Sequence, residues 1–325
     1  MNEFEIIDQC FTRKGSANSS TVKVGIGDDG AVLSCDEDKD LVVVTDTLVS
    51  GVHFCAASRP ADIGYKSLAV NLSDLAAMGA DPNWALLNLA MPDAEPKWLE
   101  EFADGFFELA DRFDVQLVGG DTSVGPLTVT VTAGGWIPNE EAITREGAKP
   151  GDLVFVSGTL GDAALGLELG LDDKQIIKWP NLTRIHRPEP RIKLGRELRN
   201  FASAAIDLSD GLASDLMHLT SASGGMGAVI YQERIPFSND ACSLRSLDEL
   251  LSLALSGGDD YELCFTVDPS REKDIALLSD RAGVRITCIG AVSETPGFWL
   301  IDLAGKCEQY SEGGYQHQWS VDTQY

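Results

Sequence analysis

Aspartate recurs directly after apolar runs, and this recurrence constrains the fold more than any other feature of the sequence. Each run is rich in aliphatic residues, as a buried strand is, and leads into glycine, aspartate and hydroxyl-bearing residues. The pattern occurs around Asp29, Asp46, Asp121, Asp207 and Asp259. Because loops at the ends of rigid strands position side chains for chemistry, it predicts acidic groups gathered at one place.

Strand-like and helix-like segments alternate along the 325 residues, which predicts two domains of α/β and α+β type. One expected helix, at residues 60–78, begins with proline and is followed by glycine, as helices often are. Composition shifts to Gly, Pro and charge at residues 144–152. We therefore expect an N-terminal α/β domain over residues 1–148 and a C-terminal α+β domain over residues 149–325.

The chain is strongly acidic: 25 Lys and Arg against 51 Asp and Glu give a formal net charge of −26. Such a surface repels nucleic acid and anionic membranes, which bind clusters of Lys and Arg, so we expect neither as a partner. A phosphorylated substrate would need a cation between itself and the protein, and a divalent metal ion is the obvious candidate.

Cysteine usage and the N-terminal residues predict a cytoplasmic protein. Seven scattered cysteines without a C-x-x-C pair argue against a disulfide framework and a zinc site. The acidic start lacks the form of a signal peptide, and no apolar stretch reaches the length of about 18 residues expected of a membrane span.

Several aspartates are candidates for binding a metal ion. Asp74 falls within the expected helix on a stripe of small and apolar residues, where an ionised carboxylate needs a partner. Magnesium takes oxygen ligands, and several carboxylates converge only around cations. Each aspartate alone fits a turn or a helix cap. The set favours a magnesium cage made of Asp29, Asp46, Asp74, Asp121, Asp207 and Asp210.

The sequence signals for nucleotide and substrate binding are weaker than those for metal binding. The absence of G-x-x-x-x-G-K-[ST] excludes a P-loop NTPase. The G-x-G-x-x-G match at residues 25–30 lacks a clear following helix and fits a turn better. Gly120 permits close approach of a ligand, and Arg145 fits either a phosphate clamp or an exposed linker. His53 suits a phosphate hydrogen bond or a structural role. Glu262 and Trp319 together suit a pocket for a cationic aromatic ring.

Six motifs, in order and over nearly the whole chain, resemble the thiamine-monophosphate kinase family. They are GIGDD at residues 25–29, TDTLVSGVHF at 45–54, NLSDLAAMGA at 71–80, GGDT at 119–122, IDLSDGL at 206–212 and SGGDDYEL at 256–263. The resemblance implies a fold like that of aminoimidazole ribonucleotide synthetase, with an N-terminal domain that dimerises. It also implies the reaction of ATP with thiamine monophosphate to give ADP and thiamine diphosphate, the last step of thiamine diphosphate biosynthesis.

The resemblance also implies the roles of individual residues. Several magnesium ions would be held by Asp29, Thr45 through its backbone oxygen, Asp46, Asp74, Asp121, Asp207 and Asp210. ATP would contact Gly120, Asp121, Arg145 and Ser209, and thiamine monophosphate would contact His53, Glu262 and Trp319. Val44 departs from the family, which often has a hydroxyl-bearing metal ligand there, and this puts one outer metal site in doubt. Direct in-line transfer to an ionised phosphate needs no dedicated catalytic acid or base.

Two alternatives remain open. Another ATP-using enzyme of this fold, such as a selenophosphate synthetase or aminoimidazole ribonucleotide synthetase, is the first; the former is expected to carry a reactive cysteine in a Gly-rich N-terminal loop, whereas Cys10 falls in an expected amphipathic helix. The second is a non-enzymatic acidic protein that binds divalent cations, although no EF-hand pattern is present.

Overall fold

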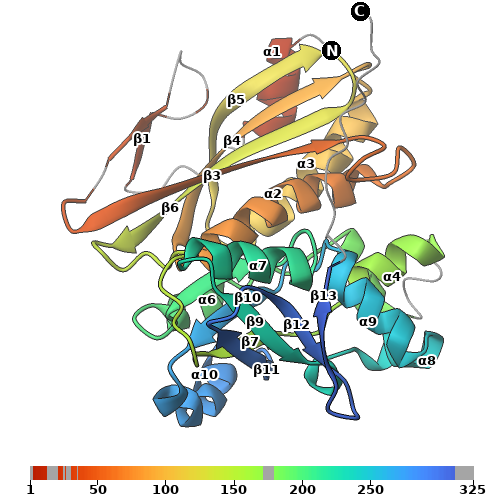
Figure 1. Ribbon diagram of the computed structural model, residues 1–325. Coiled ribbons are helices and arrows are strands. Elements are labelled where there is room, and N and C mark those ends of the chain that lie inside the picture. The colour runs from red at the N-terminus through yellow and green to blue at the C-terminus, as the bar shows by residue number, and fades with distance from the viewer. Residues whose placement is uncertain are drawn as a thin grey trace, which may run out of the picture. The chain divides into compact units, whose positions relative to one another are not determined.

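The computed structural model describes residues 3–12, 21–24, 26, 31–34, 36–170 and 179–311, and the chain divides into two compact units (Figure 1). The first unit comprises Met1–Ile143 and His186–Phe201, and the second comprises Thr144–Ile185 and Ala202–Tyr325. The domain boundary expected after residue 148 lies shortly beyond Ile143, where the first segment of the first unit ends. The segment His186–Phe201 also belongs to the first unit, although the sequence placed it in the second domain.

The first unit contains a four-stranded sheet and the helices that cover one face of it. Its elements are α1 (Glu3–Ile6), η1 (Ile7–Phe11), β1 (Val22–Val24), β2 (Val32–Leu33), β3 (Lys39–Val49), α2 (Pro60–Ala77), β4 (Asp81–Met91), α3 (Pro96–Arg112), β5 (Gln116–Val124), β6 (Thr128–Pro138) and α6 (Ile192–Leu198).

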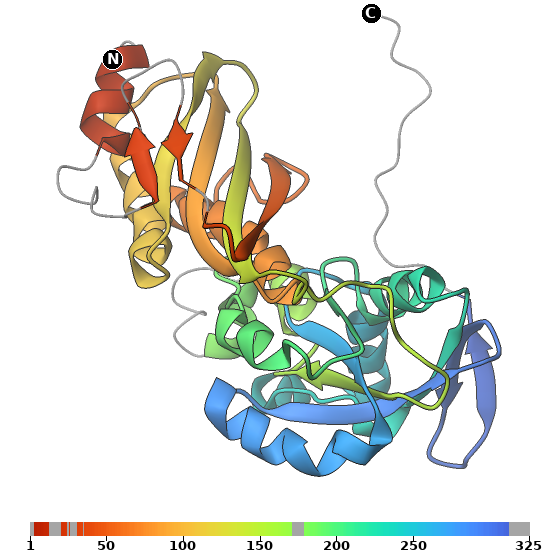
Figure 2. The ribbon, with the colours of Figure 1, turned by 90° about the vertical axis from the view of Figure 1, so that its left-hand side faces the viewer.

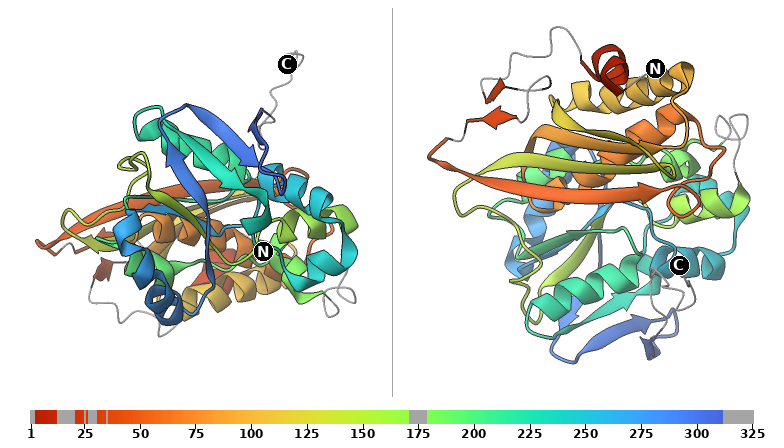
Figure 3. Two further views of the ribbon diagram at one scale, coloured as in Figure 1. Left: turned by 60° about the horizontal axis from the view of Figure 1, so that its bottom comes forward. Right: turned by 90° about the horizontal axis from the view of Figure 1, so that it is seen from above.

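The four-stranded sheet has the strand order β3-β6-β4-β5, so β3 and β5 are its edges. The β3–β6 and β6–β4 pairs are antiparallel, and the β4–β5 pair is parallel. The right-hand view of Figure 3 shows β3 as the outer strand. Along β3, Val42 and Leu48 are buried, whereas Leu41 and Val43 are 42% and 53% exposed. This alternation separates a face turned toward α2 from an open face.

Helices α2 and α3 pack closely because two glycines lie where they touch. A Cβ on Gly64 would come within 2.1 Å of the Phe102 carbonyl oxygen, and one on Gly105 within 1.8 Å of the Ala61 carbonyl oxygen. Helix α2 is almost wholly buried, as its mixture of leucine, alanine and small polar residues requires. It begins with Pro60 at its first position, as expected from the sequence.

The segment His186–Phe201 is fastened to the first unit by ion pairs. The Arg187 guanidinium donates to Asp62 at 2.6 Å and to Glu108 at 2.8 and 2.9 Å. The Arg199 Nε donates to the Gly79 carbonyl oxygen at 2.6 Å. These contacts join positions far apart in sequence, which is why composition alone did not indicate them.

The second unit is built on a seven-stranded sheet with the order β13-β12-β9-β11-β7-β10-β8. Figure 2 shows α10 alongside β11. The elements of this unit are β7 (Leu153–Ser157), α4 (Asp162–Leu169), η2 (Pro180–Ile185), β8 (Ala204–Asp207), α7 (Leu212–Ala222), β9 (Gly227–Tyr231), η3 (Gln232–Arg234), α8 (Asn239–Leu244), α9 (Leu247–Ser256), β10 (Leu263–Val267), η4 (Pro269–Asp274), α10 (Ile275–Ala282), β11 (Ile286–Ser293), β12 (Gly297–Ile301) and β13 (Cys307–Tyr310).

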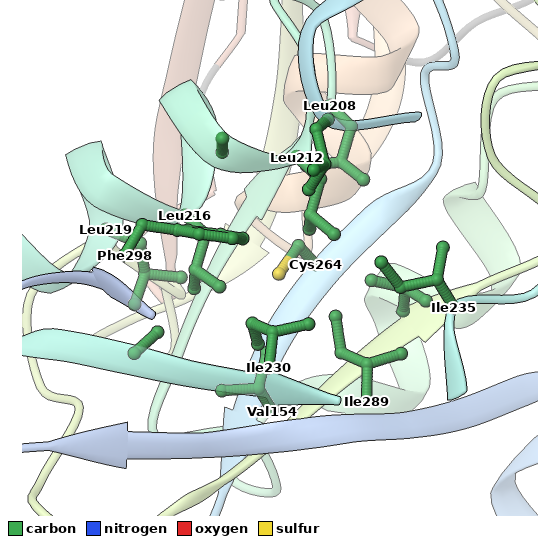
Figure 4. Close-up of a cluster of buried hydrophobic side chains, with 14 of the residues drawn as sticks. Val154, Leu208, Leu212, Leu216, Leu219, Ile230, Ile235, Cys264, Ile289 and Phe298 are labelled. Atoms are coloured by element: carbon green, nitrogen blue, oxygen red, sulfur yellow. The ribbon is translucent and has the colours of Figure 1, made fainter. Parts of the chain in front are cut away.

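The core of the second unit lies between α7 and one face of this sheet (Figure 4). Leu212, Leu216 and Leu219 recur at helical spacing on α7 and are fully buried. They pack over strand residues such as Ile230 and Cys264, which are also fully buried. This packing fixes the start of α7, and with it the loop that joins β8 to α7.

Candidate functional site

Asp46 lies within β3 rather than beyond its end, because the strand continues to Val49. It shares the strand face of the buried Val42 and Leu48, which is the face covered by α2. There its carboxyl group hydrogen-bonds that of Asp74 on α2. Burial raises the pKa of Asp46, although the hydrogen bond acts in the opposite sense. The sequence predicted that Asp74 needs a partner, and in the structure Asp46 is that partner.

Two carboxyl groups in contact are poised to bind a cation. Without one, like charges repel, and one of the two groups is favoured to keep a proton. A divalent ion would remove that repulsion and replace the proton. The pair therefore has the donor chemistry of a magnesium site, which takes one or two carboxylates together with phosphate oxygens.

Thr45 lies on the opposite, open face of β3. Its hydroxyl lies 3.0 Å from that of Thr132 and donates to the Val131 carbonyl oxygen at 3.2 Å. Val44 pairs with Ala133 of β6 and is half-buried on the Asp46 face. A valine there supplies no oxygen beside Asp46, so the departure from the family pattern removes one potential ligand.

Asp121 lies in β5, at the other edge of the sheet from Asp46. Cross-strand pairing places Asp46 in a row with Val131, Leu87 and Gly120, whereas Asp121 lies in the adjacent row with Asn88. Adjacent rows face opposite sides, and three strand spacings amount to about 14 Å. Within one copy of the first unit, Asp46 and Asp121 therefore do not converge.

Gly120 is required by the sheet itself. Its φ is +151°, and an added Cβ would lie 1.8 Å from the Leu87 carbonyl oxygen of β4. The structure thus supplies a packing reason for this glycine. Its predicted contact with ATP remains a separate expectation.

His53 follows β3 and presents one ring nitrogen to its own loop. Its Nδ1 accepts a hydrogen bond from the Val49 backbone N–H at 2.9 Å. An accepting Nδ1 places the proton of the neutral ring on Nε2, which is then a donor. The Lys66 ammonium donates to the His53 carbonyl oxygen at 3.2 Å and fixes the loop on α2. The ring is therefore oriented to donate one hydrogen bond.

In the second unit, the loop after β8 is locked onto the segment before β10. The Leu208 N–H donates to the Glu262 carbonyl oxygen at 2.9 Å, and the Tyr261 N–H to the Leu208 carbonyl oxygen at 2.8 Å. The Asp259 N–H donates to the Ser209 carbonyl oxygen, also at 2.8 Å. These bonds set the main chain that carries Asp207 and Ser209.

The facing segment is held in an unfavourable backbone conformation. Asp259 and Tyr261 have φ values of +61° and +49°, and Gly258 has +70°. A Cβ on Gly258 would lie 2.4 Å from the Ser209 carbonyl oxygen. Such conformations cost about 1–3 kcal/mol each for non-glycine residues and persist where surrounding contacts enforce them, often at functional sites.

Asp215 was not among the residues predicted from the sequence. It is 3% exposed on α7. Burial raises its pKa to about 8, and the nearby charges of Asp207 and Asp210 act in the same direction. Its spacing could have revealed it, because it lies three residues after Leu212 and one before Leu216, on the apolar face of the helix.

Glu262 is 1% exposed and already hydrogen-bonded. Its Oε1 accepts from the Arg184 guanidinium at 2.8 Å, and its Oε2 from the Ser157 hydroxyl at 2.5 Å. The Arg184 side chain is 19% exposed. A direct contact between Glu262 and a substrate cation would therefore involve a change at Arg184. Sequence reasoning did not indicate this ion pair.

The remaining predicted residues are placed as follows. Arg145 is exposed in the segment that opens the second unit. Asp29 and Trp319 lie outside the described residues. Within the described ranges no three His, Cys, Asp or Glu side chains are grouped so as to hold a metal ion by themselves. Nor does any helix in this part of the chain have the length and apolarity needed to cross a membrane.

Known proteins resemble the chain over nearly its full length. Residues 27–137 match the family described as AIR synthase related protein, N-terminal domain. Thiamine-monophosphate kinase of Escherichia coli (strain K12) is 45% identical over 309 residues, which cover 94% of this chain and 92% of that protein.

Two solved structures resemble the chain as well. The crystal structure of thiamine-monophosphate kinase from Stenotrophomonas maltophilia K279a has a TM-score of 0.83 and 43% identity, covering 87% of this chain and 92% of that one. AaThiL complexed with AMPPCP and TMP has a TM-score of 0.76 and 34% identity, covering 92% and 93%. The fold predicted from the sequence is confirmed.

Proposed function

The chain belongs to the thiamine-monophosphate kinase family, and from that premise we propose how its residues carry out the reaction. It transfers the terminal phosphoryl group of ATP to the phosphate of thiamine monophosphate, giving ADP and thiamine diphosphate. The observation that carries this function is the relative solved with AMPPCP and TMP, whose chain aligns with nearly all of this one.

Magnesium fits the oxygen donors that the structure provides. The contacting carboxyl groups of Asp46 and Asp74 offer one pair, and Asp207 and Asp210 flank a rigid loop in the second unit. Pairs of carboxylates suit magnesium, which completes its shell with phosphate oxygens and water. When bound, the ions would neutralise charge on the phosphates. The proposed ligands are Asp29, the Thr45 backbone oxygen, Asp46, Asp74, Asp121, Asp207 and Asp210.

The protein groups bind and orient the two substrates. His53 donates from Nε2 to the phosphate of thiamine monophosphate, since its Nδ1 is occupied by the Val49 amide. Gly120, Asp121, Arg145 and Ser209 contact ATP. The acceptor oxygen is ionised at neutral pH, so no side chain needs to remove a proton from it. In-line alignment then provides most of the catalysis.

Glu262 and Trp319 are proposed to contact the cationic rings of thiamine monophosphate. A carboxylate suits a cationic ring electrostatically, and an indole suits it through its π face. The Arg184 guanidinium is itself a planar cation held against Glu262. This pairing supports the idea that the Glu262 position is built to bind positive charge.

We propose a homodimer formed through the first unit. The open face of β3 exposes Leu41 and Val43, and Asp121 is remote from Asp46 within one copy. A second copy covering this face would bury the apolar side chains and would bring in a second set of acidic residues. Sedimentation equilibrium tests the proposal, which predicts twice the mass of 34.9 kDa; a monomer at micromolar concentration contradicts it.

Phosphorylation of thiamine monophosphate is favoured over the two alternatives, another ATP-using enzyme of this fold and a non-enzymatic cation-binding protein. Burial raises the pKa of the Cys10 thiol, and the negative charge of Glu100 acts in the same direction. A thiol held in its neutral form is a poor nucleophile, which disfavours chemistry of the selenophosphate synthetase type. We expect Cys10→Ser to retain thiamine monophosphate turnover; loss of turnover would favour that alternative.

We further propose a cytoplasmic location. Six cysteines within the described residues carry free thiols, which suits a reducing compartment.

The catalytic function is tested by calorimetry with ATP and by chromatography of the products. Magnesium-dependent ATP binding and formation of thiamine diphosphate support it, whereas metal-independent binding without product supports the scaffold alternative.

A further inference from the structure

We propose that Asp215 is a positioning residue for the phosphoryl-transfer site. Its carboxyl group holds the main chain at Asp210, so that Asp207 and Asp210 keep the orientation in which they bind magnesium. This inference rests on the proposed function of those two aspartates. Asp215 belongs to none of the residue sets predicted from the sequence, and the geometry points to its role.

The Asp215 side chain turns back from α7 toward the residues that precede the helix. Its Oδ2 accepts the Asp210 backbone N–H at 3.0 Å, and the Ser209 N–H also donates to it. Both amides precede the helix start at Leu212. These two amides oppose the rise in the Asp215 pKa that burial causes, and they tie the side chain to the main chain before the helix.

The contact between Asp215 and the Asp210 amide holds the last part of the loop that joins β8 to α7. The N–H and carbonyl groups of Leu208 and the carbonyl group of Ser209 are bonded to the segment at residues 259–262. The next amide, that of Asp210, is bonded to Asp215. Loss of the Asp215 acceptor would therefore release Asp210 while leaving Leu208 in place.

Asp215 acts through the main chain rather than as a ligand. Its side chain is 3% exposed among the leucines of α7, and one of its oxygens is already occupied by an amide. An ion would have to be desolvated to reach it. Residues that orient metal ligands from behind typically change metal affinity by about 10–100-fold when they are removed.

The experiment compares Asp215→Ala with Asp215→Asn, which keeps an oxygen able to accept the amide. The matched control is Asp152→Asn, since Asp152 is also 3% exposed and accepts a backbone amide, that of Lys149, at 3.0 Å. Asp152 precedes β7 at the Val267 end of β10, whereas Asp207 pairs at the Leu263 end. Four residues of strand separate these ends by about 13 Å.

Two readouts are measured on the full-length chain. In Asp215→Ala, the magnesium concentration for half-maximal turnover should rise about 10–100-fold, with turnover at saturating magnesium largely kept. Hydrogen exchange at the Asp210 amide should quicken in the metal-free protein, whereas exchange at Leu208 should not change. Asp215→Asn and Asp152→Asn should both resemble the wild type.

Three results would overturn the proposal: an unchanged magnesium dependence in Asp215→Ala, an equal loss in Asp215→Asn, or unchanged exchange at Asp210. If Asp215→Ala does not fold, Asp215→Ser replaces it, because its hydroxyl is too short to reach the Asp210 amide. A wild-type protein that makes no thiamine diphosphate would defeat the proposed function instead. Amide exchange would still decide whether Asp215 holds the loop.

Discussion

Removal of Arg184 should destabilise the second unit strongly, because it leaves a buried carboxylate without its partner. Glu262 is 1% exposed, and its Oε1 lies 2.8 Å from Arg184 Nη1. At an effective dielectric near 20 this attraction is about 6 kcal/mol before desolvation is counted. Deletion of one partner of a buried pair costs about 3–5 kcal/mol. Arg184→Ala should therefore lower the free energy of opening of the second unit by about 3–5 kcal/mol.

A double-mutant cycle separates the pair from simple loss of packing. Glu262→Gln should cost less than Arg184→Ala, since Arg184 is 19% exposed and can be hydrated. The double variant should be more stable than Arg184→Ala, because the Glu262 charge is gone and only the longer pair of Arg184 with Asp162, at 4.0 Å, stays broken. The matched control is Lys306→Ala, which breaks a surface ion pair with Glu308 in the same unit and should cost at most about 1 kcal/mol.

The assay is amide hydrogen exchange across β10, which reports the opening of the second unit alone. A chain of two units need not unfold in one step, so a single global transition would be ambiguous. The reasoning is refuted if Arg184→Ala loses no more stability than Lys306→Ala, or if the double variant is less stable than Arg184→Ala.

Three further predictions follow from the site. Asp46→Asn should lower magnesium-dependent turnover by about 100-fold or more while raising the melting temperature of the metal-free protein, since it removes a repulsion; a lower melting temperature would contradict this. Gly283 has a φ of +71° and no atom within 4 Å of an added Cβ, so Gly283→Ala should lower stability by roughly 1–2 kcal/mol through backbone strain alone. Gly258 has a φ of +70° and a carbonyl oxygen close to an added Cβ, so Gly258→Ala should lower stability by well over that amount. Equal losses of stability in the two variants would refute the clash. The Asp215 pKa, raised from 3.8 to about 8, favours the neutral carboxyl in the folded state. The contribution of Asp215 to metal-free stability should therefore decrease as pH rises from about 4 to about 8, and Asp215→Asn should remove this part of the decrease in urea titrations. Asp260, whose pKa burial also raises, should keep its own part of the decrease in that variant. An unaltered pH profile in Asp215→Asn would contradict the prediction.

Local sequence signals predicted the local structure well. The helix expected at residues 60–78 is α2 to within a residue. The expectation that Asp74 requires a partner came from its apolar stripe, and the structure supplies Asp46. In each case the information lies within one element: its periodicity, its end signals or the burial of its face.

Long-range pairing accounts for what the sequence did not predict. The pattern of apolar runs before aspartates predicted carboxylates beyond strand ends, yet Asp46 and Asp121 lie inside strands, at opposite edges of the sheet. The order β3-β6-β4-β5 arises from pairings between strands distant in sequence, which local patterns do not encode. The return of His186–Phe201 to the first unit depends on ion pairs such as Arg187–Asp62, which are equally non-local.

The central claim is direct, magnesium-dependent transfer of phosphate from ATP to thiamine monophosphate. The most direct test supplies ATP labelled with ³²P in its terminal phosphate and follows the label by chromatography. We predict that the label appears in thiamine diphosphate in a one-to-one ratio with ADP, and that EDTA abolishes its appearance. Label found only in free phosphate, or transfer that continues undiminished in EDTA, would contradict the account.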